Sequence, residues 1–181
     1  QWGALDEAER TMPEVAIAAA RRLLVLGGNV ELSRHWLLPV WERMVQGGSA
    51  QAPALSDGQR VKLIQALELG FSLAGGAPDA PWLTRIESAQ LRSPGDPRLQ
   101  YLAGITCMHL KLWGKAQQLL RQSLPLLHDE ALEQNAWVAL AALAEQRDDD
   151  SAATAAYKSA VEIGRRGKVQ TTDLPSDAPA R

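Results

Sequence analysis

Breaker residues divide this chain of 181 residues into short segments whose apolar residues recur at the spacing of an α-helix. Gly27-Gly28 ends the first segment, and Pro94 ends the fourth. Pro39 lies inside the second segment and should bend or break it, because proline has no backbone N–H to donate. Asp57 is expected to cap the third helix at its N-terminus. The spacing predicts helices over 13–26, 30–45, 58–74, 79–93, 97–111, 113–125, 131–146 and 150–165.

The last three helix pairs share residue types at fixed offsets. Gly70, Trp82, Ile86 and Ala89 have counterparts 34 residues later, and these have counterparts after a further 37 residues. Small residues let two helices approach closely, and a large residue one turn later fills the groove between them. A period of 34 with two helices per unit is typical of the tetratricopeptide repeat (TPR). The counterparts are Gly104, Ala116, Leu120 and Ser123, then Ala141, Ala153, Tyr157 and Ala160.

Composition supports the helical interpretation. The 29 alanines and 27 leucines make up almost a third of the chain, whereas Val, Ile and Phe together supply 15 residues, too few for a sheet. We therefore predict an all-α, TPR-like α-solenoid of about four helical hairpins that form a right-handed superhelix. The expected parts are a loosely matching first hairpin over 1–46, a linker over 47–57, three TPR-like hairpins within 58–165 (58–94, 97–128 and 131–165) and a polar tail over 166–181.

Charge and the lack of targeting segments exclude several classes of protein. The 19 basic and 21 acidic residues nearly cancel, whereas a nucleic-acid binder normally has a basic surplus. No apolar run approaches the roughly 20 residues that span a bilayer, and the acidic first residues do not form a secretory signal. Because the sequence starts at Gln1 rather than at methionine, we expect it to be a piece of a longer protein.

The chain contains no motif for catalysis or for a metal site. A Gly-x-Ser-x-Gly motif and a phosphate loop are both missing, and His35, His109 and His128 lie too far apart to offer a local ligand pair. The aspartates at 148–150 lack the alternating ligands, glycine and glutamate of a calcium loop, and we interpret them as an N-terminal cap of the last helix. We therefore expect neither an enzyme nor a metal site.

The run Cys107-Met108-His109 contains three side chains that can ligate haem iron. The repeat register places Cys107 at a core position of its helix, where a small buried side chain is expected. The chain has no Cys-x-x-Cys-His motif for covalent haem attachment, and its single cysteine excludes an internal disulfide. Packing is the preferred interpretation of this run, and haem ligation is the alternative.

The concave face of the predicted solenoid is the strongest candidate site. In a TPR stack the first helix of each pair lines this face, and peptides or partner helices bind there. A mixture of aromatic, methionine and arginine side chains suits a protein-binding surface. The residues expected to line it are Leu67, Phe71, Arg98, Tyr101, Ile105, Met108, His109, Asn135, Val138 and Glu145.

The second half of the chain contains YLAG at 101–104, LWGKAQQLL at 112–120 and AWVALAALAEQRDD at 136–149. These stretches resemble the C-terminal half of the HemY-type proteins, which are proteobacterial, membrane-anchored TPR proteins associated with haem and porphyrin biosynthesis. The LWGKA turn is the most specific piece, because a TPR turn usually carries Gly-Asp-Tyr. The 47–57 linker is longer than the family pattern leads one to expect, and the turn at 147–150 lacks the usual glycine. The resemblance covers most of residues 2–164 and also includes PEVAIAAARRLLVLGG at 13–28, PVWERM at 39–44 and PWLTRIESA at 81–89.

The resemblance implies a non-catalytic scaffold. Such a protein would assist the assembly or regulation of late haem biosynthesis (protoporphyrin and protohaem) through protein contacts in its groove, with late haem-pathway enzymes as partners. It would be anchored in the inner membrane by two N-terminal helices absent from this sequence, with the repeats on the cytoplasmic face. No cofactor is expected. Two alternatives stay open: a haem or porphyrin carrier that uses Met108 and His109, and a generic TPR adaptor in an unrelated envelope assembly.

Overall fold

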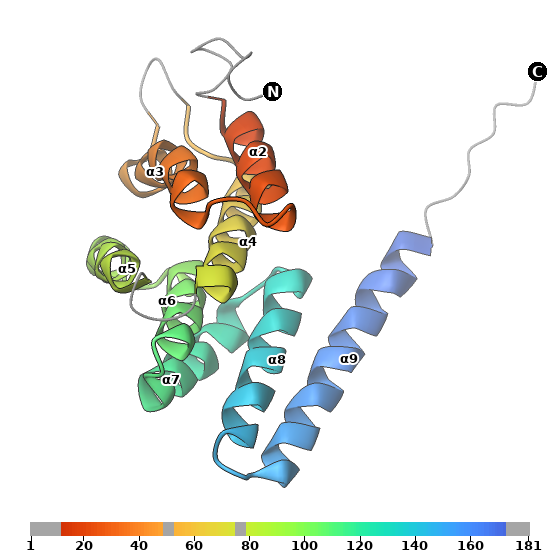
Figure 1. Cartoon of the computed structure of the whole chain (residues 1–181). Coiled ribbons are helices and arrows are strands. Elements are labelled where there is room, and N and C mark those ends of the chain that lie inside the picture. The colour runs from red at the N-terminus through yellow and green to blue at the C-terminus, as the bar shows by residue number, and fades with distance from the viewer. Residues whose placement is uncertain (1–11, 49–52, 75–78, 173–181) are drawn as a thin grey trace, which may run out of the picture.

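The computed structural model describes residues 12–48, 53–74 and 79–172, with side chains described as far as Arg166. Part of the expected first hairpin, the middle of the expected linker and the end of the expected tail lie outside these residues. The helices, shown in Figure 1, are α2 (Pro13–Val25), α3 (Val30–Gln46), α4 (Asp57–Ala74), α5 (Ala80–Arg92), α6 (Pro97–His109), α7 (Trp113–Ser123), the 3-10 helix η3 (Leu124–Leu126), α8 (Glu130–Glu145) and α9 (Asp150–Thr172).

The all-α prediction is confirmed, since the described residues contain helices and turns but no strand. Two helices differ from the predicted ones. Helix α3 continues through Pro39, which was expected to bend or break it, so the helix does not break there. Helix α9 runs on to Thr172, so the polar sequence expected to be a tail from residue 166 begins as helix. Among the described helices, none is both long and apolar enough to cross a membrane.

Side-chain caps occur at the starts of several helices, α4 and α9 among them. Ser56, rather than the expected Asp57, caps α4: the Gln59 backbone N–H donates to Ser56 Oγ at 3.2 Å, and the Ser56 N–H donates to Gln59 Oε1 at 2.8 Å. This reciprocal pair is a capping box, which satisfies two backbone donors that have no partner within the helix. At α9, Asp149 accepts from the Ala152 N–H at 3.0 Å, so the aspartate run does cap this helix as expected.

The turn between α8 and α9 contains no glycine. Asp148 adopts a left-handed backbone conformation with φ of 56°. Aspartate tolerates this region better than most residues because its short polar side chain can bond locally. The missing glycine at 147–150 is therefore compatible with a tight hairpin between α8 and α9.

The helices pack on neighbours along the chain in a regular order. Helices α2, α4, α6 and α8 contact one another in sequence, and α3, α5 and α7 each contact the first helix of the following pair. Within pairs, α2 packs on α3, α6 on α7, and α8 on α9. Figure 1 shows this succession, with α9 alongside α8 at the C-terminal end.

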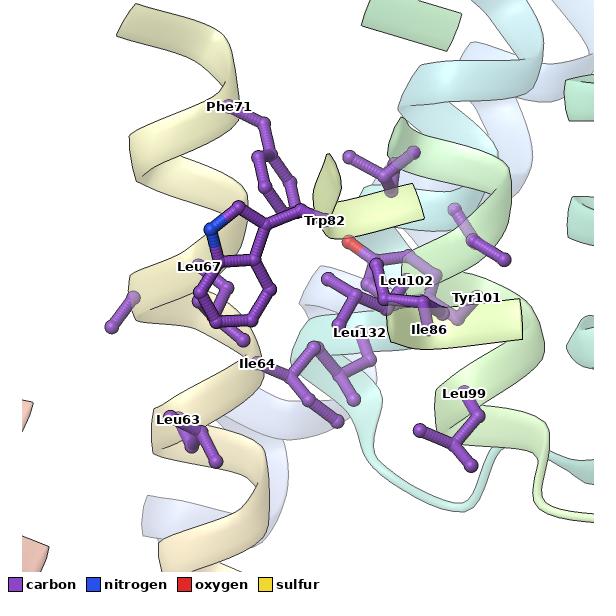
Figure 2. Close-up of a cluster of buried hydrophobic side chains, with 14 of the residues drawn as sticks. Leu63, Ile64, Leu67, Phe71, Trp82, Ile86, Leu99, Tyr101, Leu102 and Leu132 are labelled. Atoms are coloured by element: carbon purple, nitrogen blue, oxygen red, sulfur yellow. The ribbon is translucent and has the colours of Figure 1, made fainter. Parts of the chain in front are cut away.

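The pair α4 and α5, expected to be the hairpin 58–94, is more open than the others. Its two helices meet mainly through side chains, with the rings of Phe71 and Trp82 6.2 Å apart at an interplanar angle of 64°. Trp82 stands where the following repeats have Ala116 and Ala153, so its indole occupies space that a small residue would leave to the opposing backbone. The ring lies beside Leu67 and Phe71 of α4 (Figure 2).

A continuous apolar core joins the pairs. Trp41 of α3 meets Trp82 edge-on at 5.7 Å, which links the first pair to the centre of the molecule. Cys107 is fully buried in this core, which confirms the sequence prediction for this residue. Other buried members, several of them drawn in Figure 2, include Leu63, Ile64, Ile86, Leu99, Leu102 and Leu132.

Gly104 allows the close approach of α6 and α7. A Cβ at this position would lie 2.8 Å from Leu120 Cγ and 3.3 Å from the Leu120 backbone nitrogen. Its counterpart Gly70 faces a different neighbour, since a Cβ there would meet Leu24 and Val30 of the first pair at 3.9 Å. Gly104 therefore allows a close contact within a helix pair, whereas Gly70, its counterpart in the sequence, lies at a contact between two pairs.

We predict that Gly104→Ala destabilises the fold while Gly114→Ala does not. The added methyl at residue 104 overlaps Leu120 and should cost about 1–3 kcal/mol of unfolding free energy, more than the roughly 1 kcal/mol gained in helix propensity. Gly114 lies in α7 with nothing within 4 Å of an added Cβ, so it reports the propensity gain alone. Urea denaturation followed by circular dichroism measures both; equal midpoints for the two variants would contradict the close approach.

Candidate functional site

A cavity of about 490 Å³ lies along the row formed by α2, α4, α6 and α8. We call it the inner groove. Three of its helices contribute residues spaced by three or four, because such residues share one face of a helix. It is lined by Arg21 of α2, by Gln65, Glu68, Leu69 and Ser72 of α4, by Ile105, Met108 and His109 of α6, and by Asn135, Val138, Ala139 and Ala142 of α8.

A second cavity of about 490 Å³ adjoins the inner groove at the C-terminal end of α6. The two cavities share Met108, His109 and Ala142 as lining residues. The second cavity is bounded further by the turn between α6 and α7 and by the end of α8, which supply Lys111, Trp113, Leu143, Glu145 and Gln146. Together the two cavities form a continuous depression along α6 and α8.

Glu68 is the centre of a polar network between three helices. The Tyr101 hydroxyl of α6 donates to Glu68 Oε2 at 2.8 Å, and the Asn135 Nδ2 of α8 donates to the same oxygen at 3.4 Å. Burial raises the pKa of the Glu68 carboxyl, and the two hydrogen bonds lower it by a smaller amount. Burial and the neighbouring carboxylate also raise the pKa of Tyr101, so its hydroxyl stays protonated and acts as a donor.

An ion pair joins α3 to the start of α5 beneath the groove. The Arg34 guanidinium donates to the fully buried Asp79 carboxylate, and also to Glu31 at 2.8 Å. The same guanidinium lies 5.4 Å from the centre of the Phe71 ring. Burial raises the pKa of Asp79 more than Arg34 lowers it. Burial lowers the pKa of His109, which favours the neutral imidazole, and the Asp79 charge opposes this effect.

Half of the residues expected to line the binding face do line the inner groove, namely Ile105, Met108, His109, Asn135 and Val138. Glu145 lies in the adjoining cavity. Val138 is the most exposed apolar side chain in the α8 wall of the inner groove among the described residues. It is 44 % exposed.

The other expected groove residues lie elsewhere. Leu67, Phe71 and Tyr101 are at most 1 % exposed, so they support the groove from the core and cannot touch a partner. Leu67 and Phe71 lie on the face of α4 that packs in the core, where the Phe71 ring contacts the large Trp82. Glu68 lies on the face of α4 that lines the groove. Arg98 lies at a separate cavity beside α6, where it forms an ion pair with Asp57 at 3.1 Å.

Sequence reasoning missed the α4 wall of the groove, and Glu68 in particular. A signal was present, because Glu68 is the acidic residue within the otherwise apolar stretch ALELGF. Its hydrogen-bond partners, however, lie 33 and 67 residues away, beyond the reach of local spacing. In the part of the chain that the structure describes, no three His, Cys, Asp or Glu side chains converge to hold a metal ion.

Comparison with known proteins identifies no relative. No protein-family model, no curated protein and no solved structure matches this chain.

We predict that Arg34→Met destabilises the fold by about 3–5 kcal/mol, because it leaves a buried carboxylate without its cation. The double variant Arg34→Met/Asp79→Leu should recover most of this loss. Arg98→Met is the matched control: its ion pair with Asp57 is exposed and should contribute less than about 1 kcal/mol. Chemical denaturation of the four proteins measures these differences, and equal losses for Arg34→Met and Arg98→Met would refute the assignment.

Glu68 should make stability depend on pH. The pKa of Glu68 in the folded protein is raised above its usual value. As the pH rises, the unfolded chain therefore releases the Glu68 proton at a lower pH than the folded protein does. The wild type should therefore lose stability relative to Glu68→Gln as pH rises from the unfolded pKa through the folded pKa. Unfolding free energies of both proteins between pH 4 and pH 7 give the comparison. Parallel curves would show that burial does not raise the pKa of Glu68.

Proposed function

We propose that this chain is a TPR-like, right-handed α-solenoid that acts as a non-catalytic scaffold and binds a partner protein in the inner groove. The observation that carries the proposal is the groove itself, which is built from one face each of α4, α6 and α8. Scaffolds of stacked helical pairs use this inner row of helices to bind peptides and partner helices.

The order of helix contacts supports the solenoid. A TPR stack needs contact within each pair, between successive first helices, and between a second helix and the next first helix. Contacts of the second and third kinds occur at every step from α2 to α8, and contacts of the first kind are extensive in three of the four pairs. About four hairpins result, of which the second, α4 with α5, is opened by Trp82.

The chemistry of the groove suits a protein segment. Ile105, Met108 and Val138 provide an apolar strip on adjacent helices, and Asn135 and Gln65 add polar groups that can bond to a backbone. Methionine adapts to irregular partners because its side chain is unbranched and polarizable. An amphipathic helix or an extended peptide would cover this strip.

The biological setting rests on sequence resemblance. Residues 13–28, 101–104, 112–120 and 136–149 resemble HemY-type proteins, and we propose on that ground that the scaffold serves late haem biosynthesis. Its partners would then be late haem-pathway enzymes, and it would act at the cytoplasmic face of the inner membrane. A generic adaptor role in another envelope assembly is the competing assignment.

A porphyrin-binding role is a second candidate, favoured by one observation. Met108 and His109 line both cavities, and burial lowers the pKa of His109, so a neutral ring nitrogen is available as an iron ligand. Titration of haemin into the protein should then produce a shifted Soret band that His109→Ala abolishes. A spectrum identical to that of free haemin would eliminate this candidate.

Partner binding predicts that a charge placed in the groove abolishes capture. We expect the wild type to retain partner proteins from a host extract and Val138→Arg to lose them at least ten-fold, about 1.4 kcal/mol of binding free energy. Leu91→Arg is the matched control, because Leu91 is 86 % exposed on α5 and lies outside the groove.

Mass spectrometry of the retained proteins distinguishes the assignments. Groove-dependent capture of late haem-pathway enzymes supports the haem setting, whereas groove-dependent capture of other proteins alone favours the generic adaptor. Equal capture by the wild type and Val138→Arg would contradict binding in the groove.

A further inference from the structure

The Glu68 carboxylate lies in the wall of the inner groove and is held in one orientation. Tyr101 and Asn135 both donate to Oε2, at 2.8 Å and 3.4 Å. Tyr101 is fully buried, so its hydroxyl is a rigid donor fixed by the core. Because both donors bind the same oxygen, Oε1 is the acceptor left for a ligand in the groove.

The charge of this carboxylate is not balanced by the described residues. Both of its donors are neutral groups, and none of the ion pairs among these residues includes Glu68. Arg21 lines the same groove from α2 but does not come within ion-pair distance. A half-buried carboxylate without a cation is costly, and the raised pKa of Glu68 reflects that cost.

The cavity around Glu68 has a mixed lining, in which Arg21, Gln65, Ser72, His109 and Asn135 are polar. Its apolar part includes Leu69, which follows Glu68 on α4, and Ile105, Met108 and Val138 of α6 and α8. Lysine and arginine combine an aliphatic stem with a cationic end, so either one matches a carboxylate that has an apolar strip in the same groove. Charge-assisted hydrogen bonds from such a cation are about twice as strong as neutral ones.

We propose that the inner groove recognises its protein partner through one lysine or arginine, whose stem packs on Ile105, Met108 and Val138 and whose cation binds Glu68. Tyr101 and Asn135 are positioning residues that hold the carboxylate toward this cation. This inference rests on the proposed function, because it names the chemistry of the segment that the scaffold binds. Charge complementarity selects the occupant: a carboxylate that forms no ion pair and lies beside an apolar strip favours a basic residue among apolar ones.

Selection from a random 12-residue peptide library displayed on phage, with the whole chain immobilised, tests the proposal. We expect the selected peptides to share one Lys or Arg flanked by apolar residues. Synthetic peptides with that residue as arginine or as neutral citrulline are then titrated by calorimetry into wild type, Glu68→Gln and Glu42→Gln. Glu42 is the matched control because it lies on α3 outside the groove.

The arginine peptide should bind Glu68→Gln about ten-fold more weakly than wild type and should bind Glu42→Gln as wild type. The citrulline peptide should bind the wild type about ten-fold more weakly than the arginine peptide does. Its affinity for Glu68→Gln should be little lower than that of the arginine peptide, because the two changes remove the same interaction. The citrulline comparison on wild type needs no substitution in the protein, so it decides the matter even if Glu68→Gln folds poorly.

Two outcomes separate this inference from the proposed function. Peptides that bind the groove, as shown by loss on Val138→Arg, but keep their affinity as citrulline forms would overturn the basic-residue inference and leave groove binding intact. Selection that yields no Val138-dependent peptide would overturn both.

Peptides recovered only after deletion of residues 1–11 or 173–181 would show that a segment of this chain occupies the groove. A dimer in sedimentation that Glu68→Gln dissociates would assign the groove to a second copy; either result overturns the proposal.

Discussion

The close approach of α6 to α7 at Gly104 is the contact on which the rest of the structure depends. Gly104 has no side chain, so Leu120 of α7 packs directly on the α6 backbone there. The remaining faces of α6 contact α4, α5 and α8. Most of α6 is therefore buried, including the polar Thr106, whose hydroxyl is satisfied within the helix by the Leu102 carbonyl at 2.7 Å. A central helix held from several sides is a rigid floor for the groove, and preorganised surfaces lose less free energy on binding.

The sequence predicted most helix boundaries, the buried position of Cys107 and the α6 and α8 walls of the groove. These features follow from local spacing, since Ile105, Met108 and His109 must share a helix face. The α4 wall could not be assigned in the same way, because it depends on how α4 rotates against its neighbours. Trp82, a large residue at a position whose counterparts Ala116 and Ala153 are small, packs its ring against Phe71 on the core side of α4. Leu67 and Phe71 face the core, and Glu68 faces the groove.

The Glu68 network shows why the wall of a groove is harder to predict than a core. Apolar burial is signalled along each helix by periodicity, whereas this network joins single polar residues from three helices. Glu68 is marked by its apolar neighbours in the sequence, but nothing local marks Tyr101 or Asn135 as its partners. Tyr101 was expected in the groove as an aromatic contact surface, but it acts from the core through its hydroxyl. The network thus couples the shape of the stack to the charge that the groove presents.

The aromatic contacts around Trp82 bear on how such a chain can change in evolution. In a regular solenoid each pair is a module that can be duplicated or deleted, because its contacts reach only its neighbours in the same way at every step. Here the Trp82 ring of α5 touches Trp41 of α3 and Phe71 of α4, and the Arg34–Asp79 ion pair spans the same helices as Trp41 and Trp82. The first two pairs are therefore interlocked, and neither could be removed or copied without exposing the other's buried groups.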